Sequence, residues 1–90
     1  MKAIEDVLAE RKRQDAKWGV QNHEPEMWLA ILGEEFGEAC QAHLADHFTR
    51  NQRTGEKKSG HLRAELVQVA AVAIAFIECL DRAANERGEG

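Results

Sequence analysis

The apolar run from Leu66 to Ile77 restricts the folds open to this chain more than any other feature, because Gln68 is its only polar side chain. The run falls well short of the roughly 20 residues that span a bilayer, so it predicts a helix of a protein core. A helix that is apolar on every side must be covered all round. One neighbouring helix cannot do this, and a chain of 90 residues buries little apolar surface by itself. We therefore expect burial by a second copy of the chain.

The rest of the sequence favours an all-α fold in a single domain, residues 1–90. It holds fourteen alanines, one proline and no alternating strand pattern. Pro25 suits the first position of a helix, since its missing N–H costs nothing there. We expect helices over about 3–16, 25–50 and 59–85, a break at 17–24, a flexible basic loop at 51–60 and a frayed tail at 86–90. The prediction is a three-helix chain that assembles into an oligomeric helical bundle.

The charge of the chain is unevenly distributed. Its formal net charge is −4, but residues 50–63 carry five bases and one acid, so the remainder is strongly acidic. The acidic balance argues against a protein that wraps nucleic acid, and we expect no stable nucleic-acid binding. A basic loop beside an acidic body suits an anion such as a phosphate, and it equally suits a solvated loop that lysines keep soluble. Charge alone does not decide between these two interpretations.

Cysteine usage and the N-terminus predict a cytoplasmic protein with no membrane partner. Cys40 and Cys79 supply neither a disulfide framework nor a Cys-x-x-Cys clip, so we expect both to be reduced core thiols. Acids at positions 5 and 6 precede any apolar stretch, which argues against a secretory signal. Cys40, His43 and His47 share one side of the second helix and offer three zinc ligands. No fourth ligand is evident, and histidine pairs on helix surfaces are commoner than zinc sites.

Two pairs of oxygen-bearing side chains stand at the same three-residue step on the second and third helices. At 100° per residue, Glu35 falls within the inward arc of the second helix, Glu38 lies at its edge and Glu34 a little further round. Glu65 and Gln68 occupy the matching step on the third helix. Buried carboxylates need compensation by a cation, and oxygen ligands suit Mg²⁺, so antiparallel packing of the two helices predicts a magnesium site. The inward arc consists of Trp28, Ile31, Leu32, Ala39 and Ala42.

Residues 32–39 and 65–70 together resemble the Glu-x-x-Glu … Glu-x-x-Asp signature of the MazG-like nucleoside triphosphate pyrophosphohydrolases. Residues 14–19, Gln-Asp-Ala-Lys-Trp-Gly, also look like a segment that short phage-type and bacterial members place ahead of the first glutamates. The resemblance covers over half the chain. It implies an all-α oligomer that uses Mg²⁺, with Mn²⁺ as an alternative ion, to hydrolyse a nucleoside triphosphate to the monophosphate and pyrophosphate.

The resemblance also implies roles for individual residues. Glu35, Glu38 and Glu65 become metal ligands, and Gln68 takes the place of the aspartate. An amide oxygen can coordinate Mg²⁺, but it brings no charge and cannot act as a base. Glu34 is an accessory acid, and Glu34 or Glu38 is the candidate that accepts a proton from the attacking water. Which of these two does so stays open.

Several other side chains are candidates for binding the substrate. Trp18 can stack on a base, and Asn22, with His23, can contact base or ribose edges. Turn hydrogen bonding by the asparagine is an equally good interpretation. The candidate phosphate partners are Lys17, Lys57, Lys58 and Arg63.

A different class of function competes with the enzyme. Because Gln68 removes a charge from the signature, the chain can also be a catalytically weakened helical dimer that acts as an interaction module. Release of pyrophosphate in the presence of Mg²⁺ discriminates between the two. The sequence leaves open the preferred base and sugar, and whether the oligomer is a dimer or a dimer of dimers.

Overall fold

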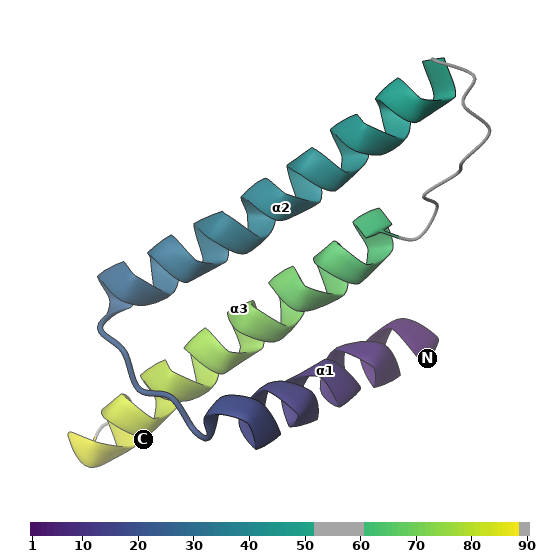
Figure 1. Ribbon diagram of the computed structural model, residues 1–90. Helices are drawn as coiled ribbons and strands as arrows, with labels where there is room; N and C mark the ends of the chain where they lie inside the picture. The colour runs from purple at the N-terminus through teal and green to yellow at the C-terminus, as the bar shows by residue number, and fades with distance from the viewer. Residues whose placement is uncertain (52–60, 89–90) are drawn as a thin grey trace.

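The computed structural model of the chain describes residues 1–51 and 61–88, with side chains described at 1–45 and 62–88. It contains three helices, α1 (Lys2–Trp18), α2 (Pro25–Asn51) and α3 (His61–Glu86), and no strand among the described residues (Figure 1). The all-α prediction is confirmed. Arg87 and Gly88 form a turn after α3, and most of the expected 51–60 loop lies outside the described residues.

Helix α1 extends two residues beyond the expected end, so Lys17 and Trp18 are helical and not part of the break. The helix ends at Gly19, whose N–H donates to the carbonyl of Asp15 at 2.8 Å. Gly19 has a φ of 73°, a left-handed conformation that glycine adopts without steric cost. The chain therefore turns two residues later than its polar composition indicated, and Trp18 is the last residue of α1.

Helices α2 and α3 form an antiparallel pair, and α1 packs on α3 (Figure 1). Within the described residues, α1 does not pack against α2. The hydrophobic core between α2 and α3 contains Trp28, which is 2% exposed and stacks on Phe76 with ring centroids 5.8 Å apart. The rings of Trp28 and His23 make a T-shaped contact with centroids 5.0 Å apart. The remaining buried apolar residues among those described are Ala39, Ala71, Val72 and Cys79. The predicted inward arc of the second helix is thus the one that packs on α3.

Helix α1 buries none of its residues and contacts α3 through charged groups. The Arg11 guanidinium lies 2.6 Å from a Glu78 carboxylate oxygen, and Arg63 lies 2.8 Å from Asp6. Hydrogen bonds from Arg63 and then Lys2 hold the pKa of Asp6 below its usual value. Because exposed ion pairs contribute little to stability, α1 is the least firmly held of the three helices.

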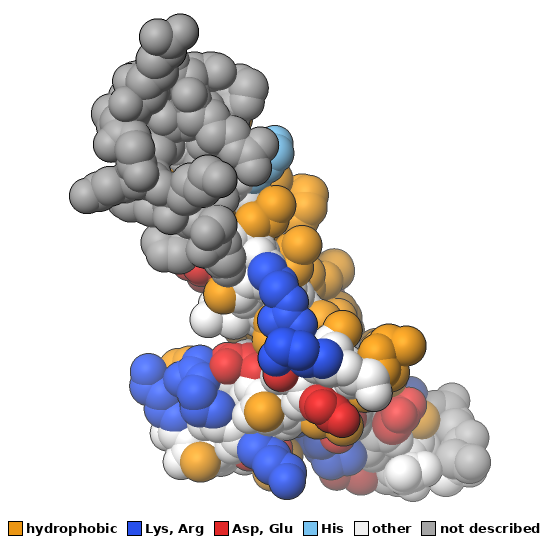
Figure 2. All heavy atoms as spheres, turned by 90° about the vertical axis from the view of Figure 1, so that its right-hand side faces the viewer, with side chains coloured by type: hydrophobic (Ala, Val, Ile, Leu, Met, Phe, Trp, Pro, Cys, Tyr) orange, Lys and Arg blue, Asp and Glu red, His pale blue; other side chains and the backbone are white. Residues whose placement is uncertain are grey.

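The apolar run of α3 is only partly covered within one chain. Ala71 and Val72 are buried, whereas Leu66 and Ile77 are about half exposed. Figure 2 shows hydrophobic side chains gathered along the right-hand edge of the described surface, with charged side chains over its lower part. In the described part of the chain, no helix combines the length and the apolar character that crossing a bilayer requires.

Candidate metal centre

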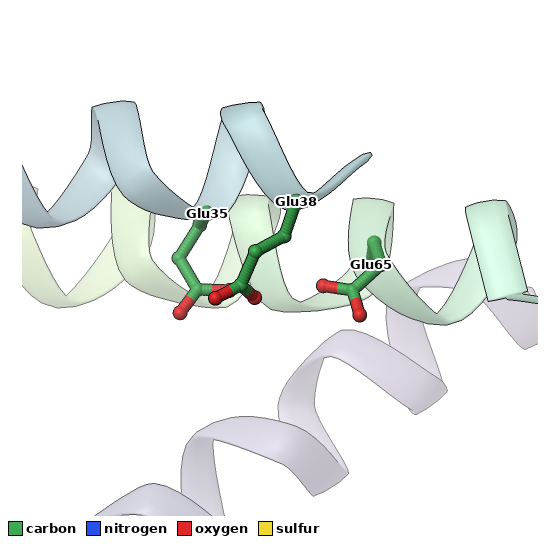
Figure 3. Close-up of side chains that lie close together, drawn as sticks. All are labelled: Glu35, Glu38 and Glu65. Carbon is green, nitrogen blue, oxygen red and sulfur yellow. The ribbon is translucent and has the colours of Figure 1, made fainter. Parts of the chain in front are cut away.

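Three carboxylates meet on one side of the α2·α3 pair. Glu35 and Glu38 project from successive turns of α2, and Glu65 projects from α3 toward them (Figure 3). One oxygen of each residue lies within 4.8 Å of the others. Two oxygens bound to the same Mg²⁺ are at most about 4.2 Å apart, so small side-chain rotations would suffice to bring this set around one ion. The antiparallel packing therefore produces the predicted cluster.

Glu35 is the residue of the cluster with the least favourable surroundings. Its Oε2 atom is buried and makes no hydrogen bond with the described residues. Burial raises the pKa of Glu35 above its usual value, and repulsion from Glu38 and then Glu65 raises it further. A divalent cation would offset both effects, since its positive charge would reduce the repulsion and its coordination would replace the hydrogen bonds that Glu35 lacks.

Gln68 and Glu35 both line a cavity of about 300 Å³. No polar or charged residue in the described part of the chain is buried, so Gln68 is not a polar side chain enclosed within the helix packing. Because Gln68 lines the same cavity as Glu35, its amide oxygen is a candidate neutral ligand. Residues of α1 and residues 19–21 also line the cavity, and its apolar lining includes Trp28, Ile31, Val72 and Ala75.

Three arginines line this cavity, and none of them belongs to the predicted set of phosphate partners. Arg11 is held by Glu78 at 2.6 Å and Asp15 at 3.1 Å, and Arg13 by Glu10 at 2.6 Å. One sequence signal was available for Arg11, because it stands at helical spacing with the apolar residues 4, 7 and 8 of α1. An arginine in an apolar stripe needs a partner across the helix interface, and the sequence does not reveal which one.

Arg82 is the third arginine of the cavity, and it fastens the α1–α2 connection to α3. Its guanidinium donates to Asn22 Oδ1 at 2.9 and 3.1 Å and to the Gln21 carbonyl at 3.0 Å. The thiol of Cys79 also lies 3.7 Å from Asn22 Oδ1. Arg82 forms no ion pair within the described residues, so its charge is not cancelled by a carboxylate.

The predicted substrate residues occupy different surroundings. Trp18 lines the cavity, and the ammonium of Lys17 lies 4.6 Å from the centroid of its ring. Asn22 faces Arg82 and not the carboxylates, and Arg63 pairs with Asp6. Lys57 and Lys58 lie outside the described residues.

Two further candidate groups stand apart from the cluster. Glu34 is exposed and is not among the three clustered acids, although its charge adds slightly to the raised pKa of Glu35. Cys40 and His43 are exposed, and the side chain of His47 lies outside the described residues. Cys79 is a buried free thiol, as expected, whereas Cys40 is exposed and not a core thiol, because it lies on the side of α2 away from α3.

The geometry thus assembles hard oxygen ligands beside a cavity that contains an exposed tryptophan and three guanidinium groups. This arrangement suits a metal-bound anion that carries an aromatic ring. Comparisons of the chain with protein-family models, curated proteins and solved structures give no match.

Proposed function

We propose that this protein is a Mg²⁺-dependent nucleoside triphosphate pyrophosphohydrolase of the MazG-like type that its sequence resembles. The observation that carries the proposal is the meeting of Glu35, Glu38 and Glu65 beside the 300 Å³ cavity. Carboxylate oxygens are the ligands that Mg²⁺ prefers, and Mn²⁺ accepts the same set. A cavity of this volume is at the lower end of the range for small-molecule sites, which fits the nucleoside part of the substrate.

The residues of the carboxylate cluster and of the cavity have complementary roles in this proposal. Glu35, Glu38 and Glu65 hold the ion, with the Gln68 amide oxygen as a neutral ligand. The bound ion supplies charge neutralisation of the phosphate oxygens. Trp18 offers a face on which a base can stack, and it is 52% exposed in the absence of a ligand. Arg82 supplies a positive charge that no carboxylate neutralises among the described residues.

The reaction itself needs a base and a leaving group. Water attacks the α-phosphorus, the bond from that phosphorus to the bridging oxygen breaks, and pyrophosphate leaves with the bond's electron pair. Glu34 or Glu38 accepts the proton of the water, because both are exposed and Glu34 is outside the cluster of ligands.

A panel of ribo- and deoxynucleoside triphosphates tests the proposal. Each is incubated with the protein and Mg²⁺ or Mn²⁺, and pyrophosphate and nucleoside monophosphate are quantified separately. Equal amounts of both products, dependent on the metal and abolished by a chelator, are expected for at least one substrate. Release of inorganic phosphate without pyrophosphate, or no turnover with either metal across the panel, would contradict the proposal.

The second candidate function is a helical oligomer that acts as an interaction module. Gln68 in place of an aspartate favours it, together with the apolar surface that the helices leave exposed. We also propose that the chain is a homo-oligomer, a dimer or a dimer of dimers, under either function. The panel separates the two functions, since the module has no turnover.

A further inference from the structure

The connection between α1 and α2, residues 19–24, lines part of the cavity although it belongs to no helix. Its residues Gly19, Val20 and Gln21 contribute to the cavity wall. Val20 is 67% exposed, so burial of apolar surface does little to hold this segment in place. Helix α1, which precedes the connection, buries no residue either. The position of this wall therefore depends on polar contacts.

Arg82 of α3 makes three of these polar contacts. Two of its nitrogens donate to the same oxygen, Asn22 Oδ1, and one of them also donates to the carbonyl of Gln21. A charged guanidinium donor makes such bonds stronger than bonds between neutral groups. Figure 1 shows the connection passing beside the C-terminal part of α3, which carries this arginine. One side chain thus joins two consecutive residues of the connection to α3.

A buried thiol lies against the same segment. The sulfur of Cys79, on the turn of α3 before Arg82, lies 3.7 Å from Asn22 Oδ1 and 3.7 Å from the carbonyl oxygen of His23. Cys79 is only 7% exposed. Because two residues of the connection touch its sulfur atom, displacement of the connection would expose this thiol.

Asn22 does not line the 300 Å³ cavity, whereas Arg82 does. An effect of Asn22 on a ligand in the cavity would therefore act through the arginine. Within the described residues, the side-chain hydrogen bonds of Asn22 are all made by its Oδ1 atom. An aspartate at this position offers the same acceptor oxygen, and an alanine offers none. Substitutions at position 22 can therefore separate loss of the contact from a change of side chain.

We propose that Arg82, through Asn22, is a positioning residue that holds the connection as a preformed wall for the nucleoside part of the substrate. This inference rests on the proposed function. A wall that is already ordered costs no further conformational entropy when the ligand binds, so the pair raises substrate affinity. The chemical step is unaffected, because the clustered carboxylates belong to α2 and α3 and not to the connection. Trp18 immediately precedes the connection, so the same contact limits movement of its stacking face.

Steady-state kinetics of two variants at position 22 test the inference, with the nucleoside triphosphate that the panel identifies. Asn22→Ala should raise KM at least about fivefold and change kcat less than about twofold, because it removes the acceptor and leaves the charge of Arg82 in place. Asn22→Asp should rescue KM, since its carboxylate accepts the same hydrogen bonds. Arg87→Gln is the control, because Arg87 is an exposed arginine that does not line the cavity, and it should leave both constants unchanged.

Alkylation of Cys79 by a maleimide is a second measurement, and it needs no turnover. Peptide mass spectrometry separates this buried thiol from the exposed thiol of Cys40, which serves as the internal reference. Asn22→Ala and Arg82→Gln should each raise the Cys79 rate at least about fivefold, because local opening of the connection exposes the sulfur. The double variant should add little, since both changes break the same contact. Asn22→Asp and Arg87→Gln should keep the wild-type rate.

Three outcomes would overturn the inference. A KM that rises as much in Asn22→Asp as in Asn22→Ala would mean that Asn22 contacts the substrate itself. A fall in kcat at unchanged KM in Asn22→Ala would place the effect on the chemical step. A Cys79 rate that rises no more than the global unfolding constant, measured by urea unfolding of the same variant, would mean that this pair does not hold the connection.

The inference and the proposed function fail in distinguishable ways. A wild type that hydrolyses no triphosphate, although its variants show the expected Cys79 rates, loses the proposed enzyme and keeps the anchored connection. A wild type that releases pyrophosphate, with an unchanged KM and an unchanged Cys79 rate in Asn22→Ala, keeps the enzyme and loses the positioning role of Arg82.

Discussion

The two sides of the α2·α3 pair differ in what they lack. On one side, Glu35, Glu38 and Glu65 crowd negative charge together, and burial and repulsion raise the pKa of Glu35. On the other side, large apolar residues such as Phe36 and Ile77 stay about half exposed. The carboxylate side has no cation to balance its charge among the described residues, and the apolar residues of the other side are not buried by another part of the described chain. The same two helices therefore carry two unfavourable surfaces, each of which a different kind of binding would relieve.

Both sides depend on the thin core between them, so its loss should have the largest effect. Trp28→Ala removes a ring that is 2% exposed and stacked on Phe76, and it should cost about 3–5 kcal/mol of unfolding free energy. Urea unfolding at one fixed protein concentration measures this. Trp18→Ala is the control, because Trp18 is 52% exposed and its loss should change stability little. Equal destabilisation by the two variants would mean that the core is not centred on Trp28.

The second prediction removes one charge from the carboxylate side and leaves the apolar side unchanged. Glu35→Gln and Glu65→Gln should each lower metal-dependent pyrophosphate release by at least about 100-fold, because each removes a charged ligand. The helical content and the oligomer mass should stay unchanged, since neutralising one acid relieves repulsion within the cluster. Glu26→Gln, an exposed acid in the first turn of α2, is the control. Undiminished turnover in either cluster variant would place the reaction elsewhere.

The third prediction adds a negative charge to the carboxylate side. Gln68→Asp should raise Mg²⁺ affinity about tenfold, or about 1.4 kcal/mol, and preserve or increase pyrophosphate release, because the added carboxylate lines the same cavity as Glu35. Thermal melts with and without Mg²⁺ measure the affinity change as a difference in stabilisation. Mg²⁺ that stabilises the aspartate variant no more than the wild type would show that position 68 is not a ligand.

The smallest expected effect is a dependence of stability on pH. Since the folded-state pKa of Glu35 is raised, the folded protein binds a proton that the unfolded chain has already released. Its contribution to stability is therefore full below the usual pKa of glutamate and is lost as pH rises through the folded-state value. Glu35→Gln should remove that loss. The free energy of unfolding of the variant, relative to that of the wild type, should therefore rise between about pH 4 and pH 7.

Chemical denaturation over this pH range with a chelator present measures the difference. Saturating Mg²⁺ should reverse it, because the ion binds the ionised carboxylate and stabilises the wild type. Glu26→Gln again serves as control, since Glu26 lies outside the cluster. Stability curves of wild type and Glu35→Gln that run parallel across the range would contradict the prediction.

Helical periodicity in the sequence determined most of the fold and indicated which residues form the carboxylate cluster. The helical period placed Trp28 and Glu35 on the arc of α2 that packs on α3, and Gln68 of α3 lines the same cavity as both. Pro25 marked the start of α2. These features depend on neighbours within a few turns of the same helix, and such neighbours are fixed by sequence spacing alone.

Only the tertiary structure decided which distant side chains meet. The pairing of Arg11 with Glu78, the pairing of Arg63 with Asp6 and the anchoring of Asn22 by Arg82 join residues that no spacing rule relates. Arg63 was expected among the phosphate partners, yet it pairs with Asp6 of α1. Helix periodicity defines the faces of each helix, whereas the relative placement of helices depends on how their side chains pack together.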